Sequence, residues 1–157
     1  SGLDSIEPFL KYTDRGVFVW CKSSNPDGYQ LQDLIVKGTP DRKIYQAIAE
    51  YCVSWNSEGN LGLIVGATYP EELKIVRDIV GELPILVPGI GSQSGDLEAS
   101  VRAGLGRKNH GLLVSSSRGI IYASSDLNNF GPAAANASSI LREDINNILE
   151  DVGRSFI

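Results

Sequence analysis

The sequence contains few of the residues that metal centres, disulfide scaffolds and histidine-dependent hydrolases need. It has two cysteines, Cys21 and Cys52, a single histidine, His110, and no methionine among its 157 residues. The cysteines have neither metal-site spacing nor the density of a disulfide scaffold, so we expect two buried thiols in a reducing cytosol. His110 lies just before an apolar run, away from the candidate loops described below. We therefore expect His110 on the surface. Without a second histidine near those loops, the sequence offers no Ser/His/Asp catalytic set.

Charge and hydropathy argue against two further classes of function. The formal net charge is -5, and no cluster of Lys and Arg is present, which argues against a nucleic-acid partner. No apolar run is long enough to cross a bilayer, and the first residues show no signal-peptide pattern. These features predict a cytoplasmic protein with no membrane partner.

The sequence instead alternates between strand and helix patterns. Apolar runs of strand length occupy Val17–Cys21, Leu61–Val65, Pro84–Val87 and Gly111–Ser115. Helical spacing of apolar residues marks Leu3–Tyr12, Asp41–Trp55, Pro70–Val80, Asp96–Gly104 and Pro132 to about Val152. Strands that alternate with helices predict an α/β fold with a parallel sheet. Four units fit either an open doubly wound sheet or half of a (β/α)₈ TIM barrel, which typically needs roughly 250 residues.

Two consecutive strand ends carry the most informative motifs. Leu86–Asp96 reads LVPGIGSQSGD, and Leu112–Ile120 reads LLVSSSRGI. Glycine lets backbone N–H groups approach a ligand closely, and Arg118 supplies a planar fork of donors. A Gly-rich loop after one strand and an arginine after the next is a common way for a βα barrel to hold a phosphate.

Two more polar loops, Ser23–Gly28 and Gly66–Tyr69, should converge on the same edge of a parallel sheet. Asp96 has the position of a helix cap, and Trp20 and Trp55 are expected in the core. Lys22 is the one lysine at a strand end, and it has no neighbouring carboxylate at strand spacing. The sequence therefore predicts a ligand site without a visible catalytic set.

Three motifs together resemble the orotidine 5'-monophosphate decarboxylase family, most closely its bacterial-type branch. They are Val65–Thr68 (VGAT), Pro88–Asp96 (PGIGSQSGD) and Ser116–Ile120 (SSRGI), and Cys21–Pro26 (CKSSNP) also fits. Ser94 stands where the family loop usually has the first glycine of Gln-Gly-Gly. The resemblance implies that residues 1–157 are the C-terminal half of a single TIM-barrel decarboxylase domain.

The resemblance also implies site residues and partners. Ser24 would hydrogen-bond the pyrimidine edge, and Pro88 would line the base pocket. Gln93 would reach the phosphate from a closing loop, and Arg118 would bind it together with the backbone around Ser117 and Gly119. The family converts orotidine 5'-monophosphate to uridine 5'-monophosphate and CO₂, as a homodimer, without cofactor or metal. Its catalytic Asp-x-Lys-x-x-Asp motif has no counterpart here, so the resemblance assigns no catalytic residue, and we expect this chain alone to be inactive.

Two other interpretations stay open from the residues. Another phosphate-binding TIM-barrel enzyme would share the phosphate loops but would not be expected to combine Ser24-Asn25-Pro26 with the Gln93 loop. A non-catalytic half-barrel binding module would need a partner to cover its open edges. In the preferred interpretation, that partner is the N-terminal half of the same enzyme.

Overall fold

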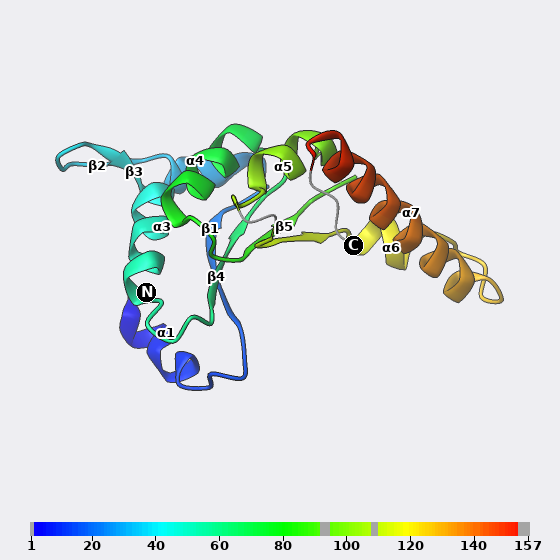
Figure 1. The fold of residues 1–157 in the computed structure, drawn as a ribbon, viewed down its shortest axis with the longest axis horizontal. Coiled ribbons are helices and arrows are strands. Elements are labelled where there is room, and N and C mark those ends of the chain that lie inside the picture. The colour runs from blue at the N-terminus through cyan, green and yellow to red at the C-terminus, as the bar shows by residue number, and fades with distance from the viewer. Residues whose placement is uncertain (1, 92–94, 108–109, 154–157) are drawn as a thin grey trace.

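The computed structural model describes residues 2–91, 95–107 and 110–153, and Figure 1 shows its fold. The helices are α1 (Leu3–Leu10), α2 (Tyr29–Gln32), α3 (Ile44–Trp55), α4 (Pro70–Val80), α5 (Leu97–Gly104), α6 (Ser117–Ile121) and α7 (Phe130–Asp151), with a short 3₁₀ turn, η1 (Pro26–Gly28). The strands are β1 (Val17–Lys22), β2 (Ile35–Val36), β3 (Arg42–Lys43), β4 (Leu61–Val65), β5 (Ile85–Pro88) and β6 (Leu112–Ser115).

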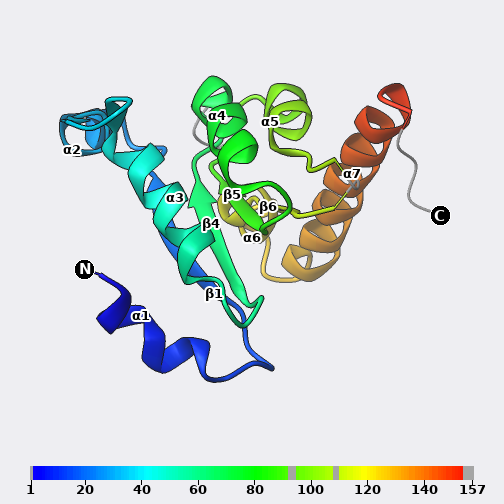
Figure 2. The ribbon, with the colours of Figure 1, turned by 60° about the vertical axis from the view of Figure 1, so that its left-hand side comes forward.

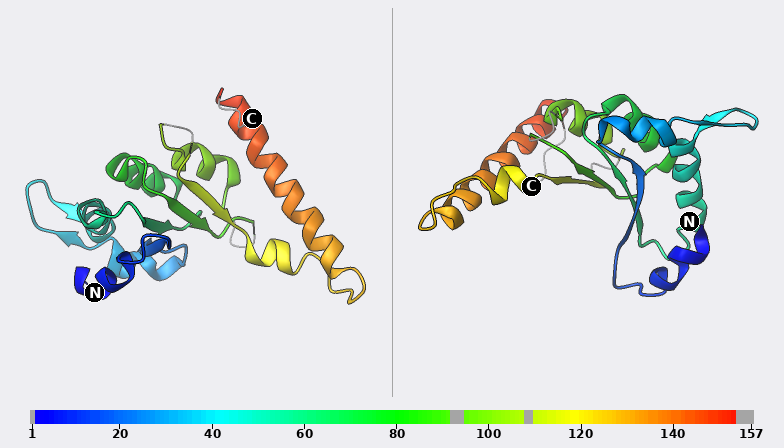
Figure 3. Two further views of the ribbon diagram at one scale, coloured as in Figure 1. Left: turned by 60° about the horizontal axis from the view of Figure 1, so that its bottom comes forward. Right: turned by 180° about the vertical axis from the view of Figure 1, so that it is seen from behind.

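Four strands form one parallel sheet in the order β1-β4-β5-β6, which is also their order along the chain. Helices α3, α4 and α5 lie side by side along one face of this sheet (Figures 1 and 2). The other face is open, and the views in Figure 3 show that none of the described elements covers it. The predicted alternation of strands and helices is confirmed, and the sheet has the one-sided exposure of half a barrel.

The register of the sheet separates the two faces. Residues that pair across parallel strands point to the same side, and one such row joins Trp20, Ile64, Leu86 and Leu113. This row faces the open side, where Trp20 and Leu113 remain 53% and 46% exposed. The neighbouring row, which includes the fully buried Leu63 and Ile85, faces the helices.

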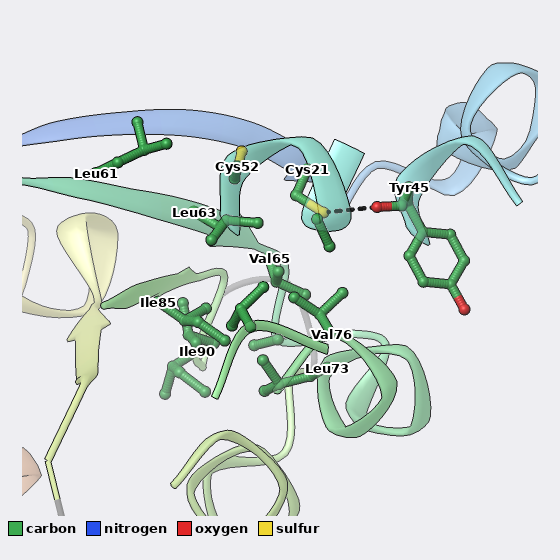
Figure 4. Packing of buried hydrophobic residues seen from close by; sticks show 14 of the residues in the cluster. Cys21, Tyr45, Cys52, Leu61, Leu63, Val65, Leu73, Val76, Ile85 and Ile90 are labelled. Carbon is green, nitrogen blue, oxygen red and sulfur yellow. Dashed lines mark hydrogen bonds between the residues drawn. The ribbon is translucent and has the colours of Figure 1, made fainter. Parts of the chain in front are cut away.

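The hydrophobic core therefore lies between the sheet and helices α3, α4 and α5. Figure 4 shows strand residues such as Leu63, Val65 and Ile85 packed against Leu73 and Val76 of α4. These residues are all fully buried. Continuous apolar runs are typical of strands whose two faces are both covered. Here the helices cover one face of the sheet and the other stays exposed.

Both cysteines belong to this core, as predicted. Cys21 of β1 and Cys52 of α3 are fully buried, and the Cys21 thiol donates a hydrogen bond to the Tyr45 carbonyl oxygen at 3.2 Å (Figure 4). Burial, reinforced by the nearby Cys52, raises the pKa of Cys21 to about 12, and burial raises the pKa of Cys52 to about 11. Neither thiol ionises appreciably in the folded chain near neutral pH.

We expect both thiols to resist a thiol-reactive dye at pH 8 until the protein unfolds. At a pKa of about 12 the thiolate fraction of Cys21 is roughly a thousandfold lower than that of a free cysteine. The measurement is the rate of dye incorporation with and without denaturant. Rapid labelling of either thiol in native buffer would contradict the buried placement.

The structure corrects three expectations. Trp20 is not in the core, because it lies in the open inner row, whereas Trp55 is half-buried and packs against the core. The helix predicted from Asp41 begins only at Ile44, because Arg42 and Lys43 form strand β3, which pairs with β2, and the predicted loop Ser23–Gly28 ends in η1. A short helix, α6, follows β6 where only a loop was expected. His110 is exposed, as predicted.

Candidate functional site

A pocket of about 220 Å³ lies at the carboxyl ends of β1, β5 and β6. The described residues that line it come from three of the predicted polar loops and from the end of the open inner row: Trp20, Ser24, Asn25, Pro88, Gly89, Ile90, Ser115, Ser116, Ser117 and Arg118. Ligands of parallel α/β sheets bind at this edge. Of these lining residues, Arg118 alone carries a charge, so the pocket suits an anion.

The β5 loop takes a shape that requires glycine. Gly89 and Gly91 have φ values of 99° and 79°, a left-handed region that residues with a Cβ rarely adopt. Ser116 Oγ donates a 3.3 Å hydrogen bond to the Ile90 carbonyl oxygen and so ties the β6 loop to the β5 loop. The two predicted phosphate motifs are therefore in direct contact.

The β1 loop is held just as closely to the β4 loop. A Cβ on Gly66 would lie 2.4 Å from the Ser24 backbone nitrogen, so the two backbones could not approach this closely with any other residue at position 66. Thr68 Oγ1 donates a 3.3 Å hydrogen bond to the Ser24 carbonyl oxygen, and the Tyr69 hydroxyl donates to that of Asn25 at 3.4 Å. These contacts fix the Ser24 and Asn25 backbone at the edge of the pocket.

Arg118 lies in the first turn of α6, exposed at the mouth of the pocket. Among the described residues its guanidinium makes no ion pair of 4.0 Å or less. The N–H groups of a first helical turn have no partner within the helix, so the backbone around Ser117 can also donate to an anion. Gly119 follows in α6 and is not among the lining residues.

The structure thus brings Ser24, Pro88, Ser117 and Arg118 to one pocket. Gln93 lies outside the described residues. The sequence reasoning missed Asn25 and Ser116, which belong to the same polar loops as the predicted residues. Trp20 was missed because it was assigned to the core, although strand alternation places it on the inner face.

Lys22 has no carboxylate at strand spacing, but the fold supplies one from further along the chain. Its Nζ lies 2.5 Å from Asp33 Oδ1 in the segment between β1 and α3. Sequence spacing could not show this pair, since Asp33 follows the short helix α2, which brings it back to the end of β1. Asp96 caps α5 as predicted, accepting a 3.0 Å hydrogen bond from the Ala99 N–H.

A second and larger hollow, about 470 Å³, lies on the outer surface beside α4 and α5. Three of the cations that line it are engaged by other groups. Lys74 pairs with Asp78, and Arg102 with Glu98 at 2.8 Å. Arg77 donates to four backbone carbonyl groups. Arg107 also lines this hollow, but none of the predicted site residues does.

Among the described residues, no group of three or more His, Cys, Asp and Glu side chains is placed to hold a metal ion. None of the described helices combines the length and apolar character needed to cross a bilayer.

Fold and pocket together define a class, namely half of a TIM barrel with an anion-compatible pocket at the carboxyl ends of its strands. Residues 1–130 match the family model described as orotidine 5'-phosphate decarboxylase / HUMPS family, and the chain belongs to this family. An orotidine 5'-phosphate decarboxylase of Cupriavidus necator is 49% identical over 146 residues, which cover 92% of this chain and 52% of the relative.

Solved structures agree with this assignment. An OMP decarboxylase of Leishmania donovani has a TM-score of 0.78 at 41% identity, with 94% of this chain and 53% of that chain covered. A UMP synthase of the same organism has a TM-score of 0.82 at 44% identity, with 94% of this chain and 31% of that one covered. The chain spans about half the length of the curated relatives that it matches.

Proposed function

We propose that residues 1–157 form the C-terminal half of a single barrel domain that decarboxylates orotidine 5'-monophosphate to uridine 5'-monophosphate and CO₂. The observation that carries this proposal is the pocket itself. In a chain of this family, it joins the Ser24 loop, the Pro88-Gly89 turn and Arg118 at one sheet edge. The proposed setting is a cytoplasmic homodimer.

In the proposed complex the two ends of the pocket have different tasks. Arg118, with Gln93 and the backbone around Ser117 and Gly119, binds the phosphate, while Ser24 and Pro88 contact the pyrimidine. The C6–carboxylate bond breaks, its electron pair stays on C6, and a lysine ammonium of the N-terminal half protonates that carbon. Phosphate contacts far from C6 lower the barrier if their binding energy is realised more fully in the closed, reactive state.

The open sheet face supports the proposal that an N-terminal half completes the barrel. The inner row of Trp20, Ile64, Leu86 and Leu113 has the composition of a barrel interior, which is filled by side chains from all the strands. An N-terminal half would cover these side chains and complete the barrel.

The test is complementation. The purified 157-residue chain is expected to show no turnover of orotidine 5'-monophosphate above a heat-killed control, because it lacks the lysine and aspartate set. Addition or co-expression of the part of the Cupriavidus necator relative that this chain does not match should give turnover. Assembly should also shift the Trp20 fluorescence to shorter wavelength, with a Trp20→Phe variant as the control.

Two outcomes would contradict the proposal. Turnover by the isolated chain would mean that the catalytic set lies within these 157 residues. A pair of halves that co-purifies and shields Trp20 yet gives no turnover would exclude the decarboxylase function and favour a binding module.

A further inference from the structure

Lys22 is a fully buried charge that the proposed chemistry does not use. It ends β1, two residues before Ser24, and is not among the residues that line the pocket. Its ammonium lies 4.8 Å from the centre of the Tyr69 ring and 5.4 Å from that of Tyr45. A buried ammonium needs a partner, and Asp33 Oδ1 provides one at 2.5 Å.

Asp33 connects the two ends of the segment that separates β1 from α3. Its Oδ1 accepts from Lys22, before the segment, and its Oδ2 lies 3.6 Å from the ammonium of Lys43, at its end. Burial alone would raise the pKa of Asp33. The hydrogen bond and charge of Lys22, together with the charge of Lys43, outweigh burial and hold that pKa below its usual range.

The sign of this shift sets the pH range of the interaction. A carboxylate whose pKa is lowered on folding stabilises the fold above its unfolded pKa, at about pH 4. That stabilisation is lost as the pH falls through the lowered value. Asp33 is therefore an anion at neutral pH, and Lys22 keeps its partner under the conditions of any assay near pH 7.

The same contacts reach the backbone of the proposed pyrimidine loop. The Ser23 N–H donates a 2.9 Å hydrogen bond to Gln32 Oε1, the residue before Asp33. On the other side, the Gly66 N–H donates to the Lys22 carbonyl oxygen at 2.9 Å. The chain around Ser24 is thus held between α2 and the β4 loop, with the Lys22–Asp33 pair at the base of the segment.

We propose that Lys22 and Asp33 are positioning residues, whose buried ion pair fixes the Ser24 loop for contact with the pyrimidine end of the nucleotide. This inference rests on the proposed function. Removing two charges from water costs several kcal/mol per ion, so a buried pair is weak evidence for stability. Its placement beside Ser24 instead points to a role in geometry.

The experiment is a double-mutant cycle in the complete enzyme, either full-length or assembled from two halves. Lys22→Met and Asp33→Asn should each lower kcat/KM by about tenfold, the equivalent of one well-placed hydrogen bond. In a Ser24→Ala background the further loss should be less than about twofold, because Lys22 acts through Ser24. Lys37→Met is the matched control, since Lys37 pairs with Asp41 on the exposed tip of the same segment.

A substrate comparison separates positioning from a general loss of structure. Lys22→Met should lower kcat/KM by the same factor for the nucleotide and for the nucleoside without its phosphate, because the affected contact is at the pyrimidine. Asp33→Asn preserves the shape of a residue that is partly exposed, so it keeps the test available if Lys22→Met fails to fold.

Three results would overturn the inference or its basis. Losses from Lys22→Met and Ser24→Ala that multiply independently would show that the pair does not act through Ser24. A lower melting temperature with unchanged kcat/KM would reduce the pair to a structural contact. An unaltered enzyme that fails to decarboxylate the nucleotide would overturn the proposed function, and this inference with it.

Discussion

In the proposed decarboxylase, replacing Arg118 with alanine should lower kcat/KM of the complete enzyme for orotidine 5'-monophosphate by roughly ten- to a hundredfold, with little change in thermal stability. A hydrogen bond to a charged group is worth about 1.5–3 kcal/mol, and 1.4 kcal/mol corresponds to about tenfold in rate. Arg118 is exposed at the pocket mouth and makes no ion pair with the described residues, so its loss should leave the fold intact.

Controls should localise the effect to the phosphate. Arg118→Lys should restore activity only in part, because an ammonium cannot make a two-point contact with a phosphate. The nucleoside lacking the phosphate should be turned over equally by the alanine variant and the unaltered enzyme. Arg142→Ala, on the exposed surface of α7, should be silent. Equal losses with nucleotide and nucleoside would refute the phosphate role.

The strands and the pocket could be predicted from the sequence because local pattern determines both. Leu61–Val65 is a continuous apolar run that ends in Gly66, and the strand occupies the predicted residues. The carboxyl ends of parallel strands meet at one edge, so the motifs at Pro88 and Arg118 had to lie close together. Topology brings the two loops together, whereas the hydrogen bond from the Ser116 side chain that joins them depends on packing.

Two features could not be predicted, because each depends on contacts remote in sequence. Asp33 reaches Lys22 only after α2 reverses the chain, and this short helix lacks the apolar period that marks longer ones. Trp20 is a large apolar residue in an apolar strand, and it is 53% exposed because none of the described elements covers that face of the sheet. An apolar strand predicts that both of its faces will be covered, but its sequence does not show which segment covers each face.

A second arginine, Arg77, lies at the opposite edge of the sheet and is expected to govern stability. Arg77 of α4 is 4% exposed, and its guanidinium donates to four carbonyl oxygens. Nε donates to Gly104 at 2.7 Å, Nη1 to Gly81 at 2.6 Å and to Leu83 at 2.8 Å, and Nη2 to Gly111 at 2.7 Å. These carbonyl groups belong to the connections that lead into β5 and β6. In TIM barrels that end of the strands serves stability, whereas the carboxyl ends carry the active site.

Arg77→Met should therefore lower the free energy of unfolding of the complete enzyme by about 3–5 kcal/mol, because it removes four charge-assisted hydrogen bonds, one of them to the carbonyl group of the buried Gly104. Arg77→Lys should recover part of the loss, since an ammonium has three donors but not the planar fork. Arg102→Met is the matched control: Arg102 is more exposed and pairs with Glu98 on the surface, so its loss should cost less than about 1 kcal/mol.

Denaturant unfolding measures the stability of all three variants, and KM for the nucleotide should stay constant below the unfolding transition. A raised KM without a loss of stability would mean that Arg77 acts on the pocket across the sheet and would refute the division of roles between the two arginines.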